Sequence, residues 1–191
     1  MILIYAIIFL VILALLLRRD LGALGRLQYR GGWKLGLVIG GLYFLQATLV
    51  LYVPGQTTFQ MLLLVLSQLA LIFLFILNRH IPGAKLFALG IILNTTVMIA
   101  NGGWMPITPE TYQALQPNRV VELQDRAPNN KSIMMSRHET NLWFLSDIIP
   151  VSVPGRRYAM SIGDLLLILG VAQFLLQGTA KKDTEPTYRP I

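Results

Sequence analysis

Five long apolar runs divide the chain, and polar or turn-forming residues separate them. The runs cover residues 2–17, 35–53, 59–77, 86–100 and 162–177. Each run is continuously apolar and does not alternate, which favours membrane-crossing helices over the strands of an outer-membrane barrel. The fourth run is short for a typical hydrocarbon core. The pattern predicts an all-α membrane protein, a single membrane domain over residues 1–191 with five transmembrane helices.

The basic side chains between the runs predict which side of the membrane each loop faces. Residues 18–34 hold five basic side chains against one acid, and the loop at 79–85 is again basic. Because loops rich in lysine and arginine stay inside, both loops are predicted to be cytoplasmic. The N-terminus is then outside, and the tail at 178–191 is cytoplasmic. The first run lacks the flanks of a secretory signal, so we expect a retained anchor in a multi-pass protein of the cell (inner) membrane.

Composition narrows the classes of function. Hydrophobic residues make up 54% of the chain and charged residues 13%, well below the share of an ordinary soluble domain. The net charge of +7 comes from basic residues that lie between the apolar runs and not on one soluble face. We therefore interpret these residues as signals of membrane orientation and expect no nucleic-acid partner. Cysteine is absent, which excludes disulfides, thiolate metal sites and thiol nucleophiles. The expected partners are the lipid bilayer and, as further candidates, other membrane-protein subunits.

Residues 101–160 form the one segment between apolar runs that is long enough for structure of its own. Six basic and five acidic residues give it a near-neutral balance, which predicts a partly helical extracytoplasmic cap between spans four and five. Thr108 is a predicted N-cap, and Ser136 opens a capping box before an apolar stretch that ends at Pro150. These signals predict two short helices, the second at the membrane surface. Residues 117–135 are expected to form an exposed loop.

Polar side chains in the outer half of the fourth span, in the cap and at the start of the fifth span are the candidates for chemistry. They are Asn94, Asn101, His138, Asp147 and Asp164. Buried ionisable residues at a membrane face are functional candidates by default. Three of them also have a structural explanation: Asn94 fits a hydrogen bond to a neighbouring helix, Asn101 a helix stop before two glycines, and Asp164 a capping box. One histidine near acids is weak evidence for a metal, so no metal site is predicted, and the sequence indicates no cofactor.

The same region resembles a known family. The motifs are Asn101-Gly102-Gly103-Trp104-Met105-Pro106, Leu142-Trp143-Phe144-Leu145-Ser146-Asp147-Ile148-Ile149-Pro150 and Ser161-Ile162-Gly163-Asp164, together with Asn94 and His138. They resemble a family of small bacterial integral-membrane proteins known only as a domain of unknown function. The resemblance lies mainly in residues 94–164. It implies a bacterial membrane location and a structured outer face, and it supplies no activity, cofactor or catalytic residue.

Two functions remain open from the sequence. The first is a non-catalytic accessory or ligand- and partner-binding membrane subunit, which the small size, the paucity of charge in the spans and the lack of a nucleophile constellation favour. The alternative is an enzyme or carrier acting on a lipid or quinone at the outer leaflet, with His138, Asp147 and Asp164 as acid–base candidates. Convergence of these side chains in a pocket open to lipid would favour the alternative. Scattered helix caps would favour the first.

Overall fold

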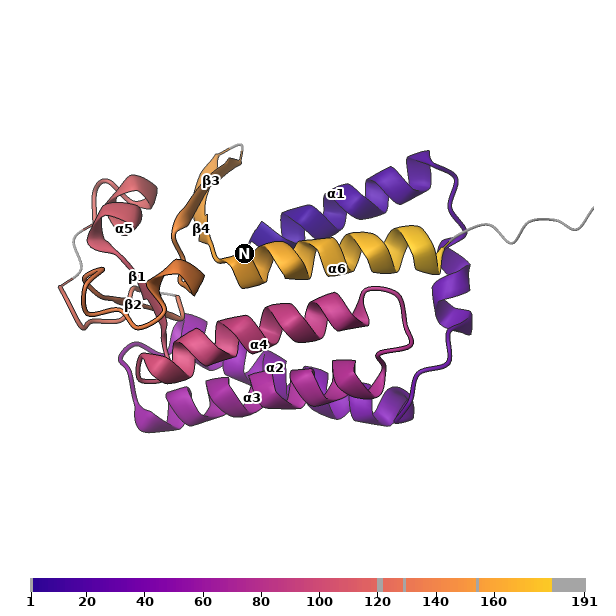
Figure 1. Cartoon of the computed structure of the whole chain (residues 1–191), viewed down its shortest axis with the longest axis horizontal. Helices are drawn as coiled ribbons and strands as arrows, with labels where there is room; N and C mark the ends of the chain where they lie inside the picture. Colours follow the sequence, from indigo (N-terminus) through magenta and orange to yellow (C-terminus); the bar gives the residue numbers. More distant parts are fainter. Residues whose placement is uncertain (1, 120–121, 129, 154, 180–191) are drawn as a thin grey trace, which may run out of the picture.

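Five long helices run alongside one another in the computed structural model, which describes residues 2–119, 122–128, 130–153 and 155–179 (Figure 1). They are α1 (Ile2–Leu16), α2 (Gly32–Tyr52), α3 (Thr58–Leu77), α4 (Ala84–Ala100) and α6 (Ile162–Gly178). Each lies at a predicted apolar run, with ends that differ by three residues or fewer. The mostly helical fold is therefore confirmed. The predicted tail at 178–191 lies outside the described residues except for its first two.

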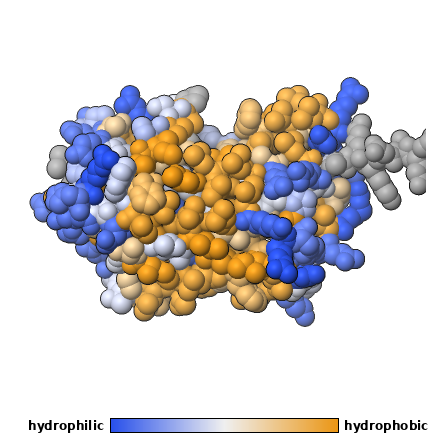
Figure 2. Space-filling model, viewed as in Figure 1, coloured by the Kyte–Doolittle hydropathy of each residue, from blue (hydrophilic) through white to orange (hydrophobic). Residues whose placement is uncertain are grey.

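Two of the helices, α2 and α3, are long and apolar enough to cross a membrane, with 21 and 20 residues. The other three are apolar but shorter. The helices expose large apolar side chains: Leu16, Phe44 and Phe59 show 75, 73 and 65% of their surface. Figure 2 shows a hydrophobic surface over the helices, with hydrophilic side chains gathered at the two ends. These features support a membrane association.

The helices pack in a row that does not follow chain order. Helix α6 lies between α1 and α4, and α3 contacts both α4 and α2, which lies behind these two helices in Figure 1. The most extensive contact joins α4 and α6. A Cβ atom added to Gly83 would overlap the carbonyl oxygen of Gly170, and one added to Gly90 would lie 2.6 Å from that of Gly163. Because only hydrogen fits at these positions, the two backbones approach closely, as small residues allow in membrane helix pairs.

The segment between α4 and α6 forms a cap at one end of the helices (Figure 1). Its strands make two two-stranded sheets: β1 (Met105–Ile107) is parallel to β2 (Ser132–Met134), and β3 (Ile149–Val153) is antiparallel to β4 (Arg156–Met160). Two helical pieces complete the cap, α5 (Pro109–Leu115) and the 3-10 helix η2 (Trp143–Leu145). Another 3-10 helix, η1 (Leu21–Arg26), lies at the opposite end of the helices.

The cap confirms one of the two predicted short helices. Helix α5 starts after Thr108, whose side chain accepts a hydrogen bond from the backbone of Thr111. The prediction of a second helix is wrong. The Ser136 hydroxyl donates a hydrogen bond to the Glu139 carboxylate within a turn, and the single helical turn between 136 and 149 is η2. Leu142 adopts a left-handed conformation at φ 54, which interrupts the apolar stretch. Leu142 divides the stretch from 136 to 149 into two shorter pieces, and neither has enough backbone hydrogen bonds to offset the cost of starting a helix.

The strands of the cap were not predicted from the sequence. The exposed loop expected at 117–135 is wrong in part, because β2 and Ala127 are buried. Ile107, Tyr112 and Met134 pack with Ala127 in a small core within the cap. These apolar side chains outweigh the polar composition of the surrounding loop, because burying each one stabilises the fold by roughly 1.5–3 kcal/mol.

A second core attaches the cap to the helices. Trp104 and Met105 of the cap pack with Leu64 of α3 and Met98 of α4. Arg126 adds a polar attachment: its guanidinium donates to the backbone oxygens of Val50 (2.7 Å) and Val53 (2.6 Å) at the end of α2. Arginine at a helix C-terminus satisfies carbonyls that have no partner within the helix. The cap is therefore held against the ends of α2, α3 and α4.

Candidate functional site

The glycine contact between α4 and α6 brings Asn94 and Asp164 together beneath the cap. The Asn94 side-chain nitrogen donates to Oδ1 of Asp164 at 3.0 Å, and the Ser161 hydroxyl donates to Oδ1 of Asn94 at 2.8 Å. Ser161 and Asp164 also form the predicted capping box at the start of α6. A Cβ on Gly163 would overlap Oδ1 of Asn94. The close approach of the two helices is therefore what places these three polar side chains in contact.

Asp147 enters the same junction from the cap, in the turn between η2 and β3. Its side chain is buried, with 6% of its surface exposed. The backbone nitrogen donates to the oxygen of Pro106 (3.2 Å), and Oδ2 accepts from the hydroxyl of Ser132 (3.3 Å). The other carboxyl oxygen, Oδ1, is buried without a hydrogen-bond partner. Because a buried polar atom without a partner is unfavourable, this oxygen is the atom most available to a proton or a ligand.

Lys131, just before β2, supplies the positive charge of the junction. The pKa of Asp147 is raised from 3.8 to about 7, mainly by burial; the charge of Lys131 opposes the rise, and the negative charge of Asp164 contributes to it. Burial acts to lower the pKa of Lys131, but the negative charges of Asp164 and Asp147 oppose burial, and the pKa is raised. Lys131 and Asp147 therefore each shift the pKa of the other, and the charge of Asp164 acts on both.

We call this set of side chains the junction cluster. Its members are Asn94, Lys131, Ser132, Asp147, Ser161 and Asp164. A carboxyl group with a pKa near neutrality can take up and release a proton under physiological conditions. No group of three histidine, cysteine or acidic side chains suited to a metal ion occurs among the described residues. The chemistry that this arrangement offers is proton exchange and hydrogen bonding to a polar group.

Asn101 lies apart from the junction cluster and has a structural role. Its side-chain nitrogen donates to the oxygens of Val97 (2.7 Å) and Asn141 (2.8 Å), and its side-chain oxygen accepts from the backbone nitrogen of Asn141 (2.9 Å). Helix α4 ends at Ala100, and the two glycines that follow Asn101 both have positive φ. The helix-stop interpretation fits these contacts, which attach the cap to the end of α4.

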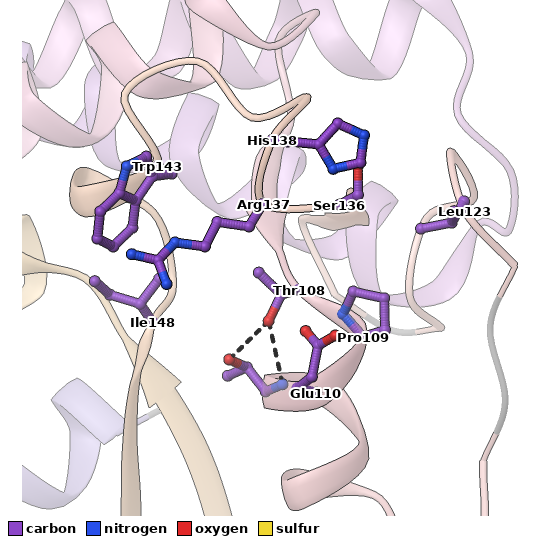
Figure 3. Close-up of a pocket in the computed structure, with 10 residues that line it drawn as sticks. Thr108, Pro109, Glu110, Leu123, Ser136, Arg137, His138, Trp143 and Ile148 are labelled. Carbon is purple, nitrogen blue, oxygen red and sulfur yellow. Dashed lines mark hydrogen bonds between the residues drawn. The ribbon is translucent and has the colours of Figure 1, made fainter.

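His138 also lies outside the junction cluster, on the wall of an open pocket of the cap (Figure 3). The pocket has a volume of about 720 Å³. We call it the cap pocket and define it by Thr108, Glu110, Ser136, Arg137, His138 and Trp143, which line it with four other residues. The guanidinium of Arg137 lies over the ring of Trp143, 3.7 Å from its centroid. His138, Arg137 and Glu110 are all exposed.

Of the five predicted candidates, Asn94 and Asp164 are in direct contact, and Asp147 is close enough for its charge to interact with that of Asp164. Asn101 and His138 have other neighbours. Sequence reasoning missed Lys131 and Ser132, because it treated their segment as an exposed loop. A signal was present: the apolar run Ile-Met-Met follows them directly, as expected for a buried strand. The seven-residue spacing of Gly83 and Gly90, and of Gly163 and Gly170, could likewise have predicted that α4 and α6 pair.

Comparison with known proteins agrees with the family resemblance of the motifs. The chain matches a family of unknown function (DUF5317) over residues 34–176, which covers α2 to α4, the cap and nearly all of α6. An uncharacterized protein of Thermotoga maritima is 37% identical over 118 residues, 60% of this chain and 63% of the relative. The aligned part thus spans less than two thirds of the relative's length. No solved structure matches the chain. The match over residues 34–176 extends across well over half of the sequence, and the chain belongs to this family of unknown function.

Proposed function

We propose that the protein is a multi-pass protein of a bacterial inner membrane, with five helices crossing the bilayer and the cap outside the cytoplasm. The apolar surface of the helices carries the proposal. Soluble monomers rarely expose apolar patches beyond a few hundred Å², whereas lipid is a suitable solvent for such a surface. The helices of 15 to 17 residues, α1, α4 and α6, fit a locally thinned bilayer.

The orientation of the helices rests on the two basic loops. The loop before α2 and the loop before α4 lie at the end of the helices opposite the cap (Figure 1). They contact each other: the backbone nitrogen of Arg30 donates to Oδ1 of Asn78 at 2.7 Å, and His80 bonds to the oxygen of Gln28 at 2.9 Å. Since basic loops remain in the cytoplasm, the cap and the start of α1 are outside.

The absence of cysteine allows a direct test of this topology. Single cysteines at Gln113, exposed in the cap, and at Gly25, exposed in η1, are treated with a membrane-impermeant maleimide in spheroplasts. We expect labelling of Gln113→Cys in sealed spheroplasts and of Gly25→Cys only after permeabilisation. Labelling of both in sealed spheroplasts, or a chain that stays in the soluble fraction, would contradict the proposal.

We infer that the role of the protein is non-catalytic, as an accessory or a ligand- and partner-binding subunit. Most candidate side chains are engaged in structural bonds: Asn94 and Asp164 bond to each other, and Asn101 attaches the cap to α4. His138 lies outside the junction cluster, apart from Asp147 and Asp164, the acids named with it as acid–base candidates. One observation favours the alternative, an enzyme or carrier for a lipid or quinone, namely the unpaired Oδ1 of Asp147.

Purification from native membranes separates these two functions. The full chain and its Asp147→Asn and His138→Gln variants are isolated in mild detergent, and co-eluting proteins and small molecules are identified by mass spectrometry. A binding subunit should keep its partner in both variants at the level of the parent chain. Loss of turnover of a co-purified lipid or quinone in Asp147→Asn, with folding and partner unchanged, would favour the alternative.

A further inference from the structure

The cap pocket holds charges of both signs that form no ion pair with any residue in the described part of the chain. Arg137 and Glu110 both line it, and both are exposed (Figure 3). The one ion pair among the described residues joins Arg26 to Asp20, which belong to the loop before α2. Since neither pocket charge is committed to an internal ion pair, both remain available to a ligand that carries an anion and a cation.

Trp143 holds the guanidinium of Arg137 in place. The guanidinium carbon lies over the indole ring, 3.7 Å from its centroid, a cation–π interaction. Stacking uses the flat face and leaves the N–H groups at the edge free to donate. A planar fork of donors suits the oxygens of a phosphate, which it can bind with two parallel hydrogen bonds. Arg137 is therefore an oriented phosphate donor rather than a mobile surface charge.

An exposed apolar ridge adjoins the pocket. Leu142, Trp143 and Phe144 expose 38, 38 and 47% of their surface. The η2 turn that carries the two aromatic residues packs against α4 and α6. Tryptophan beside basic side chains is typical of the headgroup layer of a bilayer. If α4 and α6 cross the membrane, the ridge reaches the acyl boundary and the pocket faces the headgroups.

We propose that the cap pocket binds the headgroup of an amine-bearing phospholipid of the outer leaflet, with the phosphodiester on Arg137 and the ammonium group on Glu110. The volume of about 720 Å³ accommodates a headgroup and its glycerol. The apolar ridge takes the first acyl carbons, which is why the ligand is a lipid and not free phosphate. The identification of the ligand as a lipid rests on the membrane location proposed above. The binding of a phosphate group by Arg137 does not depend on that location.

Binding to the purified full chain in a nonionic detergent tests the proposal. The probes are dihexanoyl phosphatidylethanolamine, dihexanoyl phosphatidylglycerol and inorganic phosphate, each titrated by calorimetry against a detergent blank. We expect the ethanolamine lipid to bind at least about tenfold more tightly than phosphate. Equal affinity for inorganic phosphate would overturn the lipid source, and no binding of any probe would overturn the site.

Matched variants assign the two charges. Arg137→Gln should weaken both lipids by about tenfold or more, and Arg137→Lys should recover part of the loss, because it keeps the charge without the fork. Arg119→Gln removes an exposed arginine of the cap that does not line the pocket, and it should change affinity by less than about twofold. Equal losses in Arg119→Gln and Arg137→Gln would mean nonspecific attraction and would overturn the proposal.

Glu110→Gln tests the ammonium contact separately. It should weaken the ethanolamine lipid several-fold and leave the glycerol lipid unchanged, since only the former carries an amine. An equal effect on both lipids would contradict the role of Glu110. Because these titrations use detergent, they do not depend on how many helices cross the bilayer. The cysteine-labelling experiment can therefore fail while lipid binding succeeds, and the reverse also holds.

Discussion

The junction cluster and the cap pocket both place charged side chains in the cap, but solvent reaches them differently. In the junction cluster Asp147 is buried with one oxygen unpaired, and its pKa is raised to about 7. In the cap pocket Arg137 and Glu110 are exposed and solvated. A buried charge links proton binding to folding, whereas an exposed charge stays free to meet a ligand. The cluster should therefore govern stability and its pH dependence, and the pocket should govern binding.

The largest expected effect comes from separating α4 and α6. Gly163→Val would push a side chain into Oδ1 of Asn94 and the backbone oxygen of Gly90, so we expect a loss of about 3 kcal/mol or more in unfolding free energy. Gly40→Val is the matched control, because a Cβ at Gly40 meets open space and the residue also lies inside a helix. Thermal unfolding in detergent measures both, and equal losses would show that the close helix contact is not what holds the cluster.

Asp147→Asn should remove a pH dependence of stability. The pKa of Asp147 is raised on folding, so its contribution is present below pH 3.8 and is lost as the pH rises through about 7. The difference sets an upper bound of roughly 4 kcal/mol, which relaxation and water reduce to about 2 kcal/mol. The parent chain should be more stable at pH 5 than at pH 8, and Asp147→Asn should exceed it at pH 8. Asp125→Asn, an exposed acid of the cap, is the control.

Lys131→Gln should shift that pH dependence instead of removing it. The positive charge of Lys131 lowers the pKa of Asp147, so its loss raises this pKa above about 7. Stability at pH 8 should fall by about 1 kcal/mol, as expected for a charge that acts without direct contact. The pH midpoint of the stability profile is the measurement, and an unchanged or lower midpoint would show that Lys131 does not act on Asp147.

Arg137→Gln should have the smallest effect on stability. The side chain is exposed, so its replacement is expected to change the free energy of unfolding by less than about 0.5 kcal/mol between pH 5 and pH 8. Thermal unfolding checks this value in the same preparation that is used for lipid binding. A loss of more than about 1 kcal/mol would show that the contact with Trp143 is structural, which would remove the contrast between the two sites.

The two candidate sites differ in how far the sequence could predict them. Asp164 was found with its partner Ser161, because the capping box is a local signal over four residues. Asn94 and Asp147 were found as polar residues beside apolar runs, but their meeting depends on contacts between residues far apart in the chain. The contact of Arg137 with Trp143 was not predicted, since it joins two turns whose geometry depends on the left-handed Leu142.

The sequence by itself determined the five helices, the start of α5 and the membership of the family, because apolar runs, caps and motifs act over short stretches of chain. The tertiary structure decided the rest. Helix α6 packs between α1 and α4 because paired glycines admit its backbone, and the segment at 132–134 becomes a buried strand because the cap encloses it. Lys131 enters the junction cluster for the same reason. Its position depends on the cap folding back over the helix ends. The apolar run after Ser132 is a local sign of a buried strand, but which groups that strand contacts depends on long-range packing.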